Sequence, residues 1–229
     1  MTTSTSLRFA LLITCASGFL DSYTYLARGG VFANAQTGNV ILLALNLAQR
    51  EWDQALGHLW PILAFVIGVT IAVHIKAGRL DALLPYPIRV TMGLQAMILL
   101  IVGFVPVTAP HWLVTIPIAF IAALQIELFR AIGDLNYIAV ATTGNLMRLV
   151  EAGYGAAVDR KPESRRAFVI YSSVVGAFAG GAVIGAFATH AFHGRAAWLP
   201  AGFLAITLVL FVVDEKRAVA PDERGETTD

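Results

Sequence analysis

FANAQTGNV, residues 32–40, brings a run of polar side chains and a glycine into a chain otherwise rich in Leu, Ala, Val and Ile. A second polar stretch, ATTGNL, occupies residues 141–146. Each stretch contains the triplet Thr-Gly-Asn, at 37–39 and again at 143–145. Two such triplets in an apolar chain call for one explanation.

The composition indicates a membrane protein. Of the 229 residues, 57% are hydrophobic and 14% are charged, and the mean hydropathy is +0.71. Several apolar stretches approach the ~20 residues that a helix needs to cross a bilayer. The alternative is a large soluble core of buried helices, but such helices normally have a charged outer face. We therefore expect an all-α integral membrane protein.

Charge and motifs argue against several other classes of function. The net charge of +1 gives no basic patch for nucleic acid. The sole cysteine, Cys15, excludes an intrachain disulfide. His190 and His193 lack a nearby carboxylate or cysteine that would complete a metal site. The chain also has no nucleophile elbow, phosphate loop, HExxH or CxxC motif. We expect no enzyme activity, cofactor or metal.

The chain contains an internal repeat. At an offset of 106 residues, the first triplet aligns with the second, and Asp21 aligns with Glu127. In each half an apolar helix carries one acid, a polar stretch leads to Thr-Gly-Asn, and a short helix and two longer apolar helices follow. Repeat 1 spans about 8–107 and repeat 2 about 112–213 within a single membrane domain. Such repeats are a known way of building transporter folds.

Six apolar stretches are predicted to cross the membrane, and residues 214–229 to form a polar cytoplasmic tail. The predicted spans are 8–27, 59–77, 89–107, 112–131, 167–190 and 196–213. The stretches at 29–48 and 137–157 remain. Residues 37–48 would give a helix about 18 Å long, which is too short to cross. Each stretch is therefore either a re-entrant half-helix or a strand and half-helix that cross once together.

The distribution of basic residues favours the re-entrant alternative. With six spans both termini are cytoplasmic, and of the loop residues only Arg28, Arg50 and Arg195 lie outside. Eight spans would move Lys76 and Arg79, among others, to the outside. We predict six transmembrane helices plus two re-entrant half-helices. With three spans per half, the two repeats are inverted.

The triplets suit helix ends at depth in a membrane, where Thr37 and Thr143 would open the two half-helices. Thr is a good N-cap, Gly allows close approach of another backbone, and Asn both donates and accepts hydrogen bonds. Helix N-termini that meet near the midplane would suit an anion or a polar solute. The predicted solute-binding residues are Thr37, Gly38, Asn39, Thr143, Gly144 and Asn145. The alternative is structural: the triplets cap buried helix ends and tie the two halves together.

Asp21 and Glu127 are acids within predicted spans, which is costly and marks functional candidates. They would set the charge of the central site or carry protons, and the Asp21 carboxylate could also accept hydrogen bonds from Thr37, Asn39 or free N–H groups of the half-helix. The structural alternatives are an ion pair of Glu127 with Arg130, and exposure of Asp21 at the membrane interface near Arg28.

The helix predicted at 167–190 carries Gly176, Gly180, Gly181 and Gly185 in small-xxx-small spacing. This spacing indicates tight helix packing, either within the chain or between the subunits of a homo-oligomer.

Several of these motifs resemble a known family. They are Gly18-Phe-Leu-Asp21, Gly29-Gly-Val-Phe32, the first triplet, and Thr142-Thr-Gly-Asn-Leu146. Together they resemble the YoaK-like family of bacterial inner-membrane proteins of unknown function, over nearly the whole chain. The resemblance implies a multi-pass protein of the bacterial inner (cytoplasmic) membrane. It supplies neither a substrate nor a site.

These observations predict a small-solute transporter or channel, whose partners are the lipid bilayer and an unknown small solute. The alternative is a non-transporting membrane scaffold or partner protein, in which the triplets are only structural.

Overall fold

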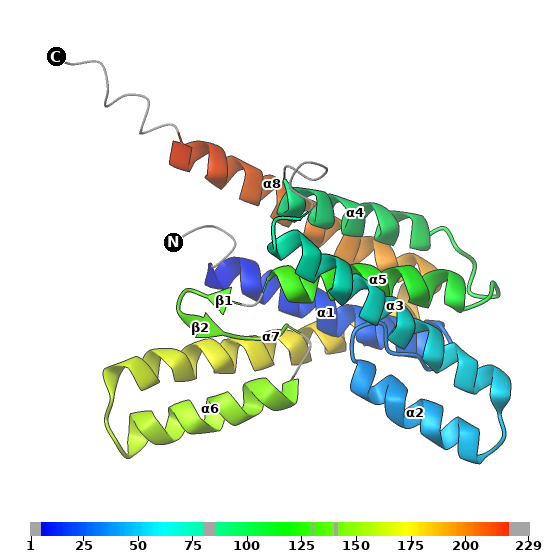
Figure 1. Cartoon of the computed structure of the whole chain (residues 1–229), viewed down its shortest axis with the longest axis horizontal. Coiled ribbons are helices and arrows are strands. Elements are labelled where there is room, and N and C mark those ends of the chain that lie inside the picture. The colour runs from blue at the N-terminus through cyan, green and yellow to red at the C-terminus, as the bar shows by residue number, and fades with distance from the viewer. Residues whose placement is uncertain (1–5, 80–85, 130, 140–141, 220–229) are drawn as a thin grey trace.

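The computed structural model describes residues 6–79, 86–129, 131–139 and 142–219, and helices dominate this part of the chain (Figure 1). The first half contains α1 (Leu7–Ala27), α2 (Gln36–Ala48), α3 (Trp52–Lys76) and α4 (Pro87–Val102). The second contains α5 (Trp112–Leu128), β1 (Ala131–Ile132), β2 (Leu135–Asn136), α6 (Thr142–Ala157), α7 (Pro162–Phe192), the 3₁₀ helix η2 (His193–Ala197) and α8 (Trp198–Val219).

Familiar local signals begin several of these helices. Ser6 is the N-cap of α1, and its Oγ accepts a hydrogen bond from the Phe9 N–H at 3.3 Å. Both α4 and α7 begin with a proline, whose missing N–H costs nothing in the first turn. The sequence thus sets these helix starts locally.

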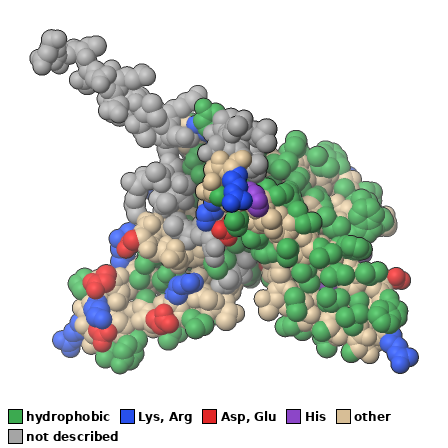
Figure 2. Space-filling view, in the orientation of Figure 1, with side chains coloured by type: hydrophobic (Ala, Val, Ile, Leu, Met, Phe, Trp, Pro, Cys, Tyr) green, Lys and Arg blue, Asp and Glu red, His purple; other side chains and the backbone are tan. Residues whose placement is uncertain are grey.

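The surface is that of a membrane protein. Three helical stretches are long and apolar enough to cross a bilayer: Leu7–Ala27, Trp52–Lys76 and Pro162–Val213. Large apolar side chains such as Val66, Ile67 and Phe187 are more than half exposed. Figure 2 shows that apolar side chains cover the side formed by α2 and α3. Charged side chains gather instead on α6 and on the start of α7.

The two short helices lie on opposite arms of the molecule. α2 folds back along α3, and α6 folds back along α7. In Figure 1 both begin near the middle of the molecule and run toward opposite ends. Their N-termini are therefore near the centre, and their C-termini lead into the turns at the two ends.

Helix pairs in one half have counterparts in the other. α1 packs along α7, and α5 packs along α3. Likewise α4 contacts α5 and α8 contacts α1, while α4 and α8 contact each other. At the offset of 106 residues, each of these pairs corresponds either to another pair or to itself.

Glycines bring α1 and α7 into close contact. A Cβ added at Gly185 would lie 2.6 Å from the Phe19 O, and one at Gly181 would collide with the Cys15 O. Gly176 and Gly180 have open space instead. The glycine-rich helix therefore packs within the chain through one face. A homo-oligomer through its other face stays a prediction.

Several predicted boundaries need correction. α3 begins at Trp52 rather than at residue 59, because the helix continues through polar residues such as Asp53 and Gln54 that lie outside the apolar stretch. α8 continues to Val219, so the predicted polar tail at 214–229 begins as helix, and residues 220–229 lie outside the described chain. The β1–β2 hairpin was not predicted; its strands are only two residues long.

Candidate functional site

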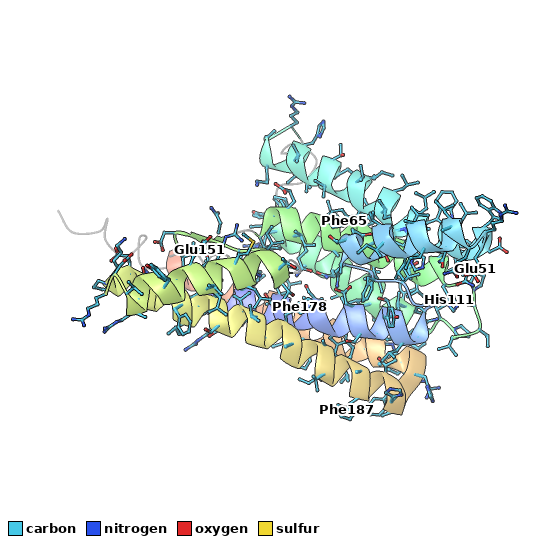
Figure 3. All side chains as sticks on the ribbon, turned by 90° about the horizontal axis from the view of Figure 1, so that it is seen from below. Glu51, Phe65, His111, Glu151, Phe178 and Phe187 are labelled. Carbon is cyan, nitrogen blue, oxygen red and sulfur yellow. The ribbon has the colours of Figure 1, made fainter. Side chains whose placement is uncertain are left out.

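A cavity of about 900 Å³ lies where the two short helices begin. Its polar lining consists of Asp21, Ser22, Asn34, Gln36, Thr37, Glu127, Thr142 and Thr143. Apolar side chains form most of the remaining wall, including Phe65 from α3 and Phe178 from α7. Figure 3 places these two rings near the middle of the molecule, with Glu51 and Glu151 toward opposite ends.

Both halves contribute equivalent residues to this cavity. Four pairs of lining residues are related by the offset of 106: Asp21 and Glu127, Phe32 and Ile138, Gln36 and Thr142, Thr37 and Thr143. The structure thus brings both predicted acids and both predicted threonines to one cavity. Gly38, Asn39, Gly144 and Asn145 are not part of its lining.

The two asparagines hold the backbone that leads into each short helix. Asn39 Nδ2 donates to the Phe32 O at 2.6 Å, and its Oδ1 accepts from the Phe32 N–H at 3.0 Å. Asn145 makes the same two bonds with Ile138, at 2.8 and 3.5 Å. An asparagine suits this task because one side chain offers both a donor and an acceptor. We call this arrangement the Asn clasp.

The clasp of the first half has additional partners. Asn39 Nδ2 also donates to the Gln36 Oε1 at 2.9 Å, and Gln36 Nε2 donates to the Ala33 O at 3.0 Å. The buried His58 of α3 lies with its Nδ1 3.5 Å from the Asn39 Oδ1. Thr142 and Ser164 occupy the positions equivalent to Gln36 and His58. Within residues 6–79 and 142–219, the polar network at α2 is the larger of the two.

Asp21 reaches from α1 to the N-terminal end of α2. Its Oδ1 accepts from the Asn34 N–H at 2.9 Å and from the Ala35 N–H at 3.3 Å. The N-cap residue, Ala35, has no side chain for this task. Asp21 thereby provides the negative charge and acceptor that a helix N-terminus favours. Its other oxygen, Oδ2, is buried and has no hydrogen-bond partner.

The expectation that Thr37 opens its helix as the N-cap is wrong. α2 begins one residue earlier, at Gln36, with Ala35 as N-cap. Thr37 is instead the second helical residue, and it faces the cavity. α6 likewise begins at Thr142, one residue before Thr143, and its preceding residue lies outside the described chain. The threonines are therefore available to the cavity.

Glu127 forms an ion pair with a lysine of α3. Its Oε1 lies 2.9 Å from the Nζ of Lys76, the last residue of α3. The Lys76 side chain is 49% exposed and that of Glu127 is 13% exposed, so solvent screens part of this attraction. Arg130, the partner considered from the sequence, lies outside the described residues.

Sequence reasoning missed a buried arginine. Arg28 was expected in an exposed loop, but it is fully buried. Its Nη2 donates to the Tyr23 Oη and to the Val105 O, each at 2.8 Å, and its Nη1 donates to the Pro106 O at 2.9 Å. The Tyr23 Oη donates to the Gly194 O at 3.1 Å. We call this cluster the Arg28 brace.

The Arg28 brace ties together the ends of α1, α4 and α7. Its partner carbonyls come from the segments that follow α4 and α7, and no local pattern in the sequence indicates them. The burial also removes the alternative in which Asp21 is exposed near Arg28, since Asp21 is only 5% exposed. Among the described residues, no group of three or more His, Cys, Asp or Glu side chains could hold a metal ion.

Comparison with known proteins gives a family but no activity. The family described as "Protein of unknown function (DUF1275)" matches residues 9–210. The UPF0700 transmembrane protein YoaK of Bacillus subtilis (strain 168) is 25% identical over 194 residues, covering 82% of this chain and 86% of that protein. No solved structure matches.

Proposed function

This chain belongs to the DUF1275 family of proteins of unknown function, and we propose that it is a transporter or channel that moves a small solute through its central cavity. The observation that carries the proposal is the shared lining: both halves contribute an acid and a threonine to one cavity. Transport sites in many membrane proteins lie between repeats, beside the ends of discontinuous helices. We propose transport without a catalytic step.

In this proposal the two halves are inverted three-span repeats, and α2 and α6 are re-entrant. The paired helix contacts and the opposite directions of α2 and α6 support it (Figure 1). The described helix α2 is 13 residues long, which is short for a complete crossing, and α6 carries Arg148 and Glu151, which are costly in a helix that crosses the bilayer. The backbone that leads into them would lie inside protein and beside the cavity, where non-helical backbone is tolerated.

The charges around the cavity favour a neutral polar or cationic solute over an anion. The carboxylates of Asp21 and Glu127 line the cavity, and its described lining contains no lysine or arginine, although Lys76 offsets part of the Glu127 charge from outside the lining. Asp21 accepts hydrogen bonds from the Asn34 and Ala35 N–H groups just before α2, so its negative charge at this helix end opposes the binding of an anion there. This narrows the sequence-based expectation, which allowed an anion.

Within this site, Asp21 is the residue proposed to exchange a proton. Its Oδ2 is buried without a partner beside the cavity, so it is the oxygen on which a proton would reside. Protonation would weaken the bonds that Oδ1 accepts from Asn34 and Ala35, because a neutral acceptor binds N–H groups less strongly than a carboxylate. A proton at Asp21 would thereby loosen the start of α2.

The glycines and asparagines of the triplets are proposed to position the site rather than to contact solute. A Cβ at Gly38 would lie 2.6 Å from the Phe32 ring, so only glycine fits beneath this cavity residue. The asparagine side chains are engaged in the Asn clasp. Thr37, Thr143, Asp21 and Glu127 are then the residues that face the solute.

Liposomes containing the purified chain would test the proposal. The probes are methylammonium, choline, glycerol and phosphate, each with and without a pH gradient. We expect at least one cationic or neutral probe to move, phosphate to be excluded, and Asp21→Asn to slow the flux by about tenfold or more, as for an essential proton-transfer group. Asp53→Asn, which removes an exposed acid at the start of α3, is the matched control. If no probe moves faster with the native chain than with an Asp21→Asn/Glu127→Gln variant, the proposal fails.

The second candidate, a non-transporting scaffold, is favoured by the Asn clasps. Because they satisfy backbone groups in both halves, the triplets have a sufficient structural role. In this case Asp21→Asn would change stability without changing the movement of any probe, and a specific partner would co-purify with the chain.

A further inference from the structure

A second pocket, distinct from the central cavity, lies between the starts of α1 and α7. Its volume is about 690 Å³. Three arginines line it, Arg8 from α1 and Arg165 and Arg166 from α7, together with an apolar wall. No acidic residue belongs to its described lining. We call it the arginine pocket.

The guanidinium groups of this pocket are available to a ligand. Arg8 and Arg165 are exposed, and neither forms an ion pair with a carboxylate of the described chain. Arg166 lies 3.8 Å from the Asp134 Oδ1, and both side chains are more than half exposed. Such a solvent-exposed pair is weak, so it competes little with a ligand.

The lining of the pocket combines cations with apolar side chains, which match the charged head group and the acyl chains of an anionic lipid. Val169 and Ile170 lie one helical turn after Arg165 and Arg166, about 6 Å further along α7. Leu7 and Ile132 complete the apolar wall from α1 and the hairpin. Cations therefore lie at the mouth, and apolar side chains lie one turn deeper. A free phosphate would need only the arginines, whereas a lipid would use both parts.

We propose that the arginine pocket binds an anionic phospholipid, with its phosphate at Arg8, Arg165 and Arg166 and an acyl chain against Val169 and Ile170. Basic pockets between membrane helices are suited to acidic lipid head groups, and each nearby arginine adds to the attraction. The bidentate geometry of arginine also matches phosphate oxygens. Bound there, the lipid fastens the start of α1 to α7, the two helices that pack closely beside the central cavity.

Native mass spectrometry of the full chain in detergent would measure this binding. The ligands are phosphatidylglycerol, cardiolipin, phosphatidylcholine and inorganic phosphate. We expect the two anionic lipids to bind about tenfold or more tightly than phosphatidylcholine, and Arg8→Gln/Arg165→Gln/Arg166→Gln to remove this preference. The triple lysine variant should keep much of it, since the positive charges remain. Arg50→Gln, which removes an exposed arginine near the tip of the α2–α3 arm, is the matched control.

The possible outcomes separate the sources of phosphate. Equal binding of all lipids, or an unchanged preference in the triple glutamine variant, would overturn the proposal. Binding of inorganic phosphate that competes with the lipids at similar concentration would assign the pocket to a free anion instead. If the triple glutamine variant does not fold, Arg165→Gln alone must lower the preference for anionic lipid, because Arg165 has no competing carboxylate. None of these results depends on whether the chain transports a solute.

Discussion

In the N-terminal half the repeated acid, Asp21, is buried and caps a helix, whereas in the C-terminal half its counterpart Glu127 pairs with a half-exposed lysine. The short helices differ too. α2 carries no charged residue, while α6 carries Arg148 and Glu151. Yet the Asn clasp is the same in both halves. The shared clasp sets the backbone, and the side chains around it give each half its own electrostatics.

This difference has a mechanical consequence. The first half is held from inside the protein, by Asp21 at one end of the α1–α2 connection and by the Arg28 brace at the other. In the second half the position equivalent to Arg28 is Asp134, which is exposed and pairs weakly with Arg166. We therefore expect the first half to be the more rigid one and the second to move more readily.

The largest effect on stability is expected at Arg28. Arg28→Lys keeps the charge but loses the planar fork that serves Tyr23, Val105 and Pro106 together. Buried carbonyls left without donors should cost about 3 kcal/mol. Asp134→Asn, at the equivalent position, should cost less than about 0.5 kcal/mol because it is exposed. Thermal unfolding in detergent would compare them, and equal losses would contradict the assigned difference in rigidity.

The next largest losses of stability are expected at the two long helix interfaces, between α1 and α7 and between α3 and α5. Gly181→Ala would bring a methyl group against the Cys15 O, and Gly68→Ala would bring one to 2.6 Å from the Phe120 O. Both changes should cost about 1–3 kcal/mol through overpacking. Gly176→Ala, where space is open, should be neutral or slightly stabilising. Chemical denaturation would measure the three. A loss at Gly176 as large as that at Gly181 would indicate a contact on the outer face of α7.

The Asn clasps offer a closer comparison of the halves. Asn39→Ala should cost about 2–3 kcal/mol, and Asn145→Ala about 1–2 kcal/mol, as expected for buried hydrogen bonds whose partners are left unpaired. The first loss is larger because Asn39 also serves Gln36 and its bonds to Phe32 are shorter. Hydrogen exchange at residues 32 and 138 would report the local opening. If Asn145→Ala speeds exchange at residue 138 more than Asn39→Ala speeds it at residue 32, the second clasp is the stronger one and the predicted order is wrong.

The smallest differences are expected from the two acids. Asp21→Asn keeps an acceptor for Asn34 and Ala35, but its neutral oxygen binds them less strongly and its amide group takes the place of the buried, unpartnered Oδ2, which should cost about 1 kcal/mol. The ion pair that Glu127→Gln removes should contribute less than about 1 kcal/mol, because Lys76 is half exposed. Thermal unfolding of both variants at low and high salt would check this. The part of the Glu127→Gln loss that comes from the Lys76 pair should shrink at high salt, since salt screens exposed pairs, whereas the Asp21→Asn loss should change little.

The apolar periodicity and the internal repeat were enough to predict the helices and the pairing of equivalent residues in the two halves. The offset of 106 residues identified Asp21 with Glu127 and located both short helices within one residue, because each helix start recurs at the same place in the repeat. It could not identify the Asn34 and Ala35 N–H groups as the donors to Asp21, or Lys76 as the partner of Glu127. These pairs are 13 to 51 residues apart in the chain and meet only through tertiary packing.

The Arg28 brace was beyond sequence reasoning for the same reason. An arginine just after an apolar helix ordinarily indicates a membrane surface. Here its partners are backbone carbonyls, which any residue type supplies, so no side-chain pattern indicates them. The burial of Arg28 follows only from the meeting of three helix ends.

The most direct test of the account is the reactivity of single cysteines in a Cys15→Ser chain reconstituted in liposomes. Thr37→Cys and Thr143→Cys line the cavity, whereas Ile41→Cys and Met147→Cys lie one turn further on outer surfaces that are 55% and 61% exposed in the protein. A thiol in hydrocarbon does not ionise, so we predict that a small water-soluble thiol reagent modifies the first pair at least about tenfold faster than the second. Equal rates for the two pairs, or faster modification of Ile41→Cys and Met147→Cys, would contradict a central aqueous cavity between two membrane-embedded half-helices.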